Sequence, residues 1–289
     1  MNDSIRAMLK KYGPLRDRSE EENALKEILQ QIALSGLHRG GFFDKAAFYG
    51  GTALRVLYNL DRFSEDMDFC LEHVDPAFSF RPFLNSVTTE LARYGFNAQV
   101  EEKRSGVDVA VNSAFVRQDT LGALLPIGRS SKGIHKKQLL KIKLEVDKLN
   151  PKGAQFCNKL ILLPTPFMVR TLSESSLFSG KLHAVLARSY QNRVKGRDFY
   201  DFIFYCSRGT GVNLIYLEAK LRNSGHYFDT TPLTLERLIA LLDEKFSQVH
   251  FDKAKEDVAP FLKVSQRQDL KNWNYELFSA MAQQITVEA

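Results

Sequence analysis

Two aspartates separated by one residue, Asp66 and Asp68, have the spacing best suited to chemistry in this sequence. On a β-strand, residues i and i+2 lie on one face, with Cα atoms about 6–7 Å apart. Carboxylates this close repel each other, which raises the pKa of one of them, and a divalent cation removes the conflict. Mg²⁺ binds one or two carboxylates together with substrate phosphates. The pair therefore predicts a magnesium site for phosphoryl or nucleotidyl transfer. The alternative is a solvated strand end.

A glycine pair, Gly50-Gly51, precedes the aspartates. It lies between a short apolar run and a helical pattern, where backbone N–H groups and a helix N-terminus can bind a phosphate. Thr52 and Ser64 add hydroxyl groups that can donate hydrogen bonds to the same phosphates. We interpret all four residues as nucleotide-binding, and the alternative for the glycines is an ordinary tight turn.

Two further charged groups occur in the second half of the chain. Lys181 and Arg188 are seven residues apart in a helical pattern, so they share a face, and a lysine there can neutralise a triphosphate. Arg197-Asp198 begins another helical pattern, in which Asp198 can cap the helix or pair with Arg197 and Lys181. Asp201 follows one turn later. The alternatives are an ordinary surface lysine and a well-capped helix.

The apolar pattern predicts the strands and helices that position these residues. Period-two alternation and short apolar runs predict strands over 46–49, 66–71, 96–101, 107–116 and 138–147, and an extended stretch over about 156–163. Apolar residues at helical spacing predict helices over 19–38, 52–60, 83–94, 173–190, 198–207, 211–223, 232–247, 252–263 and 269–287. The fold class is therefore α+β, a mixed sheet with helices followed by a C-terminal helical bundle. We expect domains at 1–165 and 166–289.

The composition is ordinary for a globular protein, with 289 residues, 44% apolar, 26% charged and a net charge of +6. Two basic runs, His135-Lys136-Lys137 and residues 188–197, suit an RNA backbone, and solvated loops are the alternative. P-loop, dinucleotide-binding, zinc-protease and serine-hydrolase motifs are absent from the sequence. Three widely spaced cysteines, no signal peptide and no membrane-length apolar run predict a cytoplasmic protein without a membrane partner.

The motifs GGT at 50–52 and RFSEDMDF at 62–69 resemble the first motif of the AbiEii/AbiGii toxin family. Members of this family belong to the DNA polymerase β-like nucleotidyltransferase superfamily. KLHAVLAR at 181–188 and RDFYD at 197–201 are similar to the later motifs of the same family. The resemblance covers about half of the chain and implies a nucleotidyltransferase-like fold for its first part.

The resemblance also implies roles for individual residues. Asp66 and Asp68 would bind Mg²⁺, Arg62 and Lys181 would bind the nucleotide, and Lys181 and Asp198 would belong to the active site. A third carboxylate is expected on a neighbouring strand. In the alternating stretch LKIKLEVD at 140–147, Glu145 and Asp147 share the face away from the core. Glu145 is the first choice because it lies well inside the strand, Asp147 is the alternative, and a charged solvent face is the ordinary interpretation.

The function implied is that of a Mg²⁺-dependent nucleotidyltransferase toxin of a toxin–antitoxin or phage-defence (abortive-infection) system. Such an enzyme would transfer a nucleotide from an NTP to an acceptor, for which tRNA is one candidate, and a cognate antitoxin would be its partner. Two alternatives stay open. One is a GTP- or ATP-binding toxin that acts without transfer, and the other is a small-molecule nucleotidyltransferase.

Overall fold

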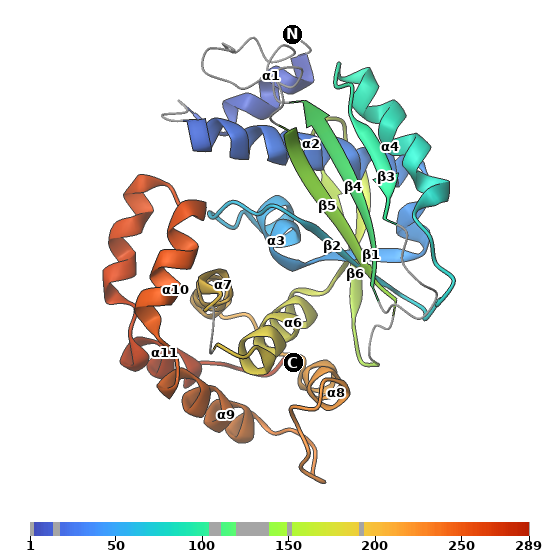
Figure 1. Ribbon diagram of the computed structural model, residues 1–289. Coiled ribbons are helices and arrows are strands. Elements are labelled where there is room, and N and C mark those ends of the chain that lie inside the picture. Colours follow the sequence, from blue (N-terminus) through green and yellow to red (C-terminus); the bar gives the residue numbers. More distant parts are fainter. Residues whose placement is uncertain are drawn as a thin grey trace. The chain divides into compact units, whose positions relative to one another are not determined.

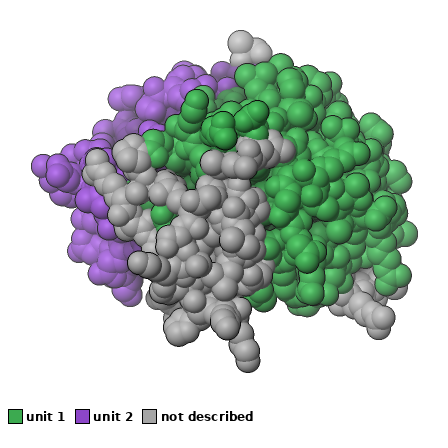
Figure 2. All heavy atoms as spheres, turned by 90° about the horizontal axis from the view of Figure 1, so that it is seen from above, with its two compact units in different colours: residues 1–59, 63–150, 158–171 green, residues 60–62, 151–157, 172–289 purple. Residues whose placement is uncertain are grey.

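The computed structural model describes residues 3–13, 18–103, 111–119, 139–148, 152–190 and 194–288. The chain divides into two compact units (Figure 2). The first comprises Met1–Asn59, Phe63–Asn150 and Asn158–Thr171, and the second comprises Leu60–Arg62, Pro151–Cys157 and Leu172–Ala289. Each unit is therefore assembled from segments that are not consecutive in the chain.

A mixed sheet is the framework of the first unit (Figure 1). Over the described residues its seven strands have the order β3-β4-β5-β2-β1-β7-β6. They are β1 (Ala46–Tyr49), β2 (Met67–Leu71), β3 (Gln99–Glu102), β4 (Val111–Asp119), β5 (Leu139–Asp147), β6 (Phe156–Ile161) and β7 (Phe167–Leu172). Strand β2 pairs antiparallel with β1 and parallel with β5, and β1 pairs parallel with β7. The mixed sheet confirms the predicted fold class.

The helices of the first unit pack against this sheet and against each other. They are α1 (Asp3–Lys10), α2 (Arg18–Arg39), α3 (Gly50–Tyr58) and α4 (Arg81–Arg93), with a 3₁₀ helix at Phe42–Asp44. Helix α2 contacts α4 and β5, while α3 contacts β1 and β2. The α2–α4 contact is close at Gly36, where an added Cβ would lie 2.7 Å from the Cα of Val87. Because α3 follows β1 directly, the Gly50-Gly51 pair forms its first turn.

Helices make up most of the second unit, as predicted for the C-terminal part. They are α6 (Glu174–Ala187), α7 (Gly196–Ser207), α8 (Leu214–Asn223), α9 (Leu235–Ser247), α10 (Phe251–Val258) and α11 (Tyr275–Ala282). Their core includes the buried rings of Phe199, Phe202, Phe246 and Phe278, whose contacting pairs have centroids 5.3–6.2 Å apart. Side-chain caps explain where α8 and α9 begin. The side chains of Asn213 and Thr234 accept hydrogen bonds from backbone N–H groups in the first turns of these helices.

Several predicted boundaries are wrong, and local chemistry explains the largest differences. The helix predicted over 269–287 is interrupted, because Asn274 accepts a hydrogen bond from the backbone N–H of Leu277 and starts α11 as a new helix. The helix predicted over 252–263 ends at Val258, since Pro260 follows within a short 3₁₀ turn. The strand predicted over 107–116 is described from Val111 and extends to Asp119, while 107–110 lie outside the described residues.

Within the described part of the chain, none of the helices combines the length and the apolar character needed to cross a bilayer.

Candidate active site

Asp66 and Asp68 lie where the loop after α3 enters β2. Strand β2 begins at Met67, so Asp66 is exposed at the end of the loop, which corrects the prediction that the strand includes it. Asp68 is half-buried, and its neighbours Met67 and Phe69 are fully buried. The predicted alternation is therefore confirmed for β2, and Asp68 faces away from the core that holds Met67 and Phe69.

The glycine turn lies directly against Asp68. Gly50 has a φ of 80°, in the left-handed region that favours glycine. A Cβ built on Gly50 would collide with the carboxylate of Asp68. Tyr49, the residue before Gly50, pairs with Asp68 in the β1–β2 register. The first turn of α3 and the Asp68 carboxylate therefore form one continuous surface, which has no room for a larger residue at position 50.

Replacing Gly50 by alanine is expected to lower both stability and activity. The left-handed backbone alone costs about 1–2 kcal/mol for a residue with a Cβ, and the collision displaces the Asp68 carboxylate. Thermal denaturation measures the first effect and a transfer assay the second. Gly180→Ala in α6 is the matched control, because a Cβ there meets open space, and it should raise stability by about 0.5–1 kcal/mol. Equal stability of the two variants would contradict the prediction.

The register of β2 and β5 decides which acid lies beside Asp68. The two strands are parallel, and Asp68 pairs with Glu145, whereas Asp147 pairs with Cys70. Neighbouring strands are about 4.8 Å apart, so Glu145 and Asp68 are adjacent in the sheet. Lys143, two residues earlier on the same face, bonds the Glu145 carboxylate at 2.6 Å. Of the two predicted candidates for a third carboxylate, Glu145 is therefore the one next to Asp68.

The two hydroxyl residues predicted to bind phosphate differ in their surroundings. Thr52 is completely buried, and its Oγ1 lies 2.9 Å from Ser64 Oγ and also bonds the backbone oxygen of Asp66. Ser64 is partly exposed. Thr52 therefore holds the loop that leads to Asp66, and Ser64 presents the more accessible hydroxyl.

A series of linked ion pairs lies in the second unit. Asp201 bonds the guanidinium of Arg62 through both oxygens, at 2.6 and 2.7 Å, and bonds Lys181 at 2.8 Å. Lys181 also bonds Asp198 at 2.9 Å, and the other oxygen of Asp198 forms an ion pair with Arg188, 3.0 Å from its Nε. Both aspartates are fully buried, and Arg62 is 2% exposed. This Arg62–Arg188 series joins three cations through two carboxylates. It confirms the predicted pairing of Asp198 with Lys181, while the Arg197 guanidinium lies over the ring of Phe261.

The ion pairs shift the pKa values of the buried groups. Burial works to raise the pKa of Asp201, but Arg62 and Lys181 outweigh it and hold that pKa below its usual value. The pKa of Asp198 is likewise lowered, because Lys181 and Arg188 outweigh its burial. For Lys181, burial works to lower the pKa, but the two aspartates raise it above its usual value, so the amine stays protonated.

These lowered pKa values predict acid sensitivity. Below about pH 4 the carboxylates of the unfolded chain bind protons that the folded chain still excludes, so the free energy of unfolding falls as the pH falls. The stabilisation by ionised Asp198 and Asp201 is fully present above about pH 4, and it is lost as the pH drops through the lowered pKa values that these groups have in the folded chain. Urea unfolding at a series of pH values between about 6 and 2 measures the slope. Asp198→Asn should reduce this slope, and an unchanged slope would contradict the assignment.

The predicted residues are divided between the two units, and some of them lie outside the described part of the chain. His135-Lys136-Lys137 and residues 191–193 of the second basic run are outside the described residues. In the structure, the guanidinium of Arg62 donates hydrogen bonds to both carboxylate oxygens of Asp201. The nucleotide-binding role of Arg62 stays a prediction. Arg62, Lys181 and Asp198 belong to the second unit, and the other predicted site residues belong to the first.

The chemistry of the first-unit carboxylates fits a magnesium ion. Asp66, Asp68 and Glu145 offer only oxygen atoms, the ligands that Mg²⁺ prefers. In the described ranges, His, Cys, Asp and Glu side chains form no ready-made group of three or more for a metal. The site therefore fits an ion held by two aspartates together with substrate oxygens.

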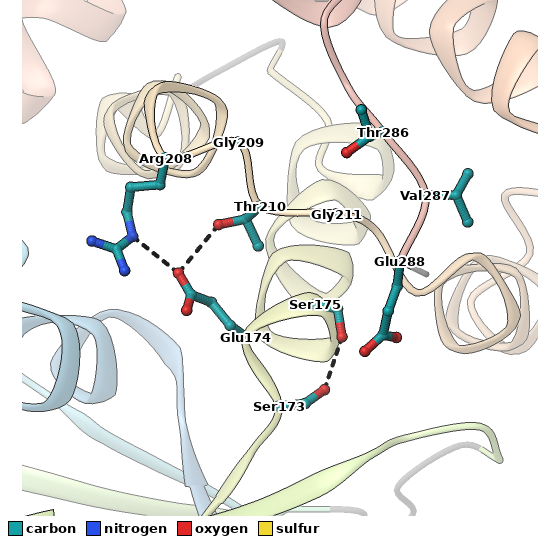
Figure 3. Close-up of a pocket in the computed structure, with 10 residues that line it drawn as sticks. All are labelled: Ser173, Glu174, Ser175, Arg208, Gly209, Thr210, Gly211, Thr286, Val287 and Glu288. Carbon is teal, nitrogen blue, oxygen red and sulfur yellow. Dashed lines mark hydrogen bonds and ion pairs between the residues drawn. The ribbon is translucent and has the colours of Figure 1, made fainter.

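A separate polar pocket of about 510 Å³ lies in the second unit (Figure 3). The start of α6, the turn after α7 and the segment 286–288 line it. Glu174 lies at its wall and accepts hydrogen bonds from Arg208 at 2.9 Å and from Thr210 at 3.2 Å (Figure 3). None of the residues predicted to act in catalysis or nucleotide binding lines this pocket.

Comparisons with known proteins agree with these features. The family model described as "Nucleotidyl transferase AbiEii toxin, Type IV TA system" matches residues 32–276. A crystal structure from H. pylori, provisionally named a nucleotidyltransferase, is 18% identical with a TM-score of 0.50, and the match covers 93% of this chain and 95% of that chain. JHP933 from Helicobacter pylori is 20% identical with the same TM-score, covering 93% and 92%. At these identities the two structures show the fold alone. No curated protein matches the chain.

Proposed function

Because the chain belongs to the AbiEii nucleotidyl transferase toxin family of type IV toxin–antitoxin systems, we propose that it transfers a nucleotide from an NTP to an acceptor in a Mg²⁺-dependent reaction. One observation carries the proposal. The Asp68 carboxylate lies against the Gly50 turn and next to Glu145 in the sheet. This arrangement places a glycine-containing helix start, of the kind that can bind phosphate, beside an aspartate and a glutamate on neighbouring strands. Nucleotidyl transfer needs both a phosphate-binding element and carboxylates for its metal ion.

Asp66 and Asp68 would hold the magnesium ion. When bound, Mg²⁺ polarises the phosphate and lowers the pKa of the attacking hydroxyl. The backbone N–H groups of Gly50 and Gly51 would bind phosphate oxygens at the N-terminus of α3, and the accessible hydroxyl of Ser64 would add a hydrogen bond. Thr52 would act through the loop that it holds.

Glu145 would accept the proton of the acceptor hydroxyl. In the reaction the hydroxyl oxygen forms a bond to the α-phosphorus of the NTP, the bond from that phosphorus to the bridging oxygen breaks, and pyrophosphate leaves. The support is the position of Glu145 beside Asp68 in the β2–β5 register. Asp147, which pairs with Cys70, is the less suitable base.

For Lys181, Asp198 and Arg62 the support is the family resemblance together with the ion pairs of the second unit. The two buried aspartates keep Lys181 protonated, which is the form that neutralises phosphate charge. Asp198 would orient Lys181 through its 2.9 Å ion pair. Arg62 would act mainly by fixing Asp201.

We further propose that the acceptor is RNA, and tRNA is the first candidate. We also propose that the protein has a cognate antitoxin as its partner and that it acts in phage defence. The net charge of +6 and the basic residues near 188–197 favour a polyanionic acceptor. This choice is separate from the transfer reaction, because an acceptor of another class would leave the roles of the carboxylates unchanged.

The test is incubation of the purified protein with each α-labelled NTP, Mg²⁺ and total cellular RNA. Label in a discrete RNA band supports transfer and identifies the acceptor. Label on the protein alone overturns the RNA acceptor. Bound nucleotide without any labelled product favours a binding toxin and overturns transfer. Asp66→Ala and Asp68→Ala are the matched variants, and full activity in both would contradict the proposed mechanism.

A further inference from the structure

Side chains hold three consecutive peptide carbonyls in the loop that leads to Asp66. The side-chain amide nitrogen of Gln30, on α2, donates to the backbone oxygen of Ser64 at 3.0 Å and to that of Glu65 at 2.7 Å. Thr52, on α3, bonds the next backbone oxygen, that of Asp66. Residues 61–66 form neither helix nor strand. The course of this loop is therefore set by donors from two helices.

Gln30 is one of the few buried polar residues of α2. It is completely buried on a helix whose buried positions are mostly apolar, among them Ile28, Leu29 and Ile32. Its amide nitrogen makes two hydrogen bonds, while its amide oxygen has no hydrogen-bond partner among the described residues. A buried amide without full hydrogen bonding destabilises a core. An apolar side chain of similar length would fill the same space without this cost, so the two N–H donors are the feature that requires glutamine.

A second contact from the same face of α2 supports this interpretation. Lys26, one helical turn before Gln30, bonds the Glu65 carboxylate at 3.0 Å. Both side chains of this pair are partly exposed, at 20% and 39%, so the pair contributes little to stability. It nevertheless joins α2 to the same loop residue whose carbonyl Gln30 binds. Helix α2 therefore makes two independent contacts to the residue preceding Asp66.

We propose that Gln30 is a positioning residue for Asp66, a role that rests on the proposed function of Asp66 as a metal ligand. Because Gln30 is fully buried, it would act without touching substrate or metal, by fixing the peptide groups immediately before the aspartate. Active-site groups must be held within about 0.5 Å of their working geometry. Loss of a hydrogen bond made directly to a metal ligand typically weakens metal binding or activity about 10–100-fold. Gln30 bonds the two peptide carbonyls that immediately precede the ligand, so an effect at the lower end of this range is expected. The family model matches residues 32–276, so Gln30 lies two residues before the matched range.

The test compares Gln30→Met with Gln31→Met in the full-length protein. Methionine has similar length and flexibility and lacks the two donors. Gln31 is the matched control because it is a buried glutamine on the same helix, and its amide bonds Glu27 instead of the loop. The first measurement is Mn²⁺ binding to the nucleotide-free protein, by titration. The second is the Mg²⁺ concentration that gives half-maximal transfer, and the third is hydrogen exchange of the backbone amides of residues 63–67.

Gln30→Met should weaken Mn²⁺ binding about tenfold, raise the Mg²⁺ midpoint of transfer by a similar factor, and speed amide exchange in 63–67. Excess Mg²⁺ should restore part of the rate. Gln31→Met should change the metal affinity less than about twofold, since it leaves the loop contacts intact. A general loss of stability would lower the active fraction in both variants without moving the Mg²⁺ midpoint.

Unchanged Mn²⁺ binding in Gln30→Met, equal weakening in both variants, or a wild-type protein that binds no Mn²⁺ would overturn the inference. The proposed function fails differently. A wild-type protein that binds Mn²⁺ in a Gln30-dependent way but transfers no nucleotide refutes transfer and supports the positioning role.

Discussion

Asp68→Asn is expected to reduce the rate of nucleotide transfer about a thousandfold at saturating Mg²⁺. A bound metal ion contributes several kcal/mol to stabilisation of the transition state, and about 4 kcal/mol corresponds to three orders of magnitude in rate. Asparagine keeps the shape of the side chain and removes its charge, so the contact with Gly50 is preserved. The measurement is transfer from the preferred labelled NTP, with circular dichroism to verify that the variant is folded.

A comparison of the other two acids sharpens this prediction. Glu145 pairs with Asp68 in the sheet and Asp147 pairs with Cys70, so Glu145→Gln should reduce the rate far more than Asp147→Asn. General-base groups typically contribute about 10²–10⁴-fold. If Asp147→Asn proved the more damaging change, the third carboxylate would be Asp147 and the role given to Glu145 would be wrong.

Asp201→Asn is expected to cause the largest loss of stability of any single change discussed for this chain, about 3–5 kcal/mol. Asp201 is fully buried and bonds both Arg62 and Lys181. The amide would remove the negative charge and leave two cations in a buried setting that the carboxylate now neutralises. Denaturant unfolding followed by circular dichroism measures the change.

The control is an ion pair at the surface of the same unit. Asp229 bonds Arg237 at 3.0 Å, with both side chains close to half exposed. Exposed pairs contribute less than about 1 kcal/mol, so Asp229→Asn should be nearly neutral. Similar losses in the two variants would show that burial of the Arg62–Arg188 series has no energetic role.

The sequence was sufficient to predict features that depend on local pattern. The alternation in β5 correctly separates buried Leu140, Ile142, Leu144 and Val146 from the charged residues between them. The same logic places Met67 and Phe69 in the core and Asp68 on the other face. The helix start at Gly50-Gly51 also follows from the local sequence, because glycine marks positions with unusual backbone angles.

Contacts distant in sequence could not be predicted in the same way. Arg62 and Asp201 are 139 residues apart, and the motif around Arg62 suggested a ligand contact instead of a buried pair. The register that selects Glu145 over Asp147 depends on strand pairing, which a single sequence leaves open. The helical pattern of the sequence did not single out Gln30, whose burial appears only in the structure. Its partners are backbone oxygens, which carry no sequence information.

Each unit contains segments that are not consecutive in the chain, and this limits how the protein can be divided into fragments. Two segments that precede residue 166, Leu60–Arg62 and Pro151–Cys157, belong to the second unit. A fragment that began at residue 166 would lack Arg62, the guanidinium that neutralises Asp201. It would also lack Gly153, whose carbonyl accepts a hydrogen bond from the capping residue Asn213. Separating the activities of the units by truncation will therefore fail, and point substitutions in the intact chain are the appropriate tool.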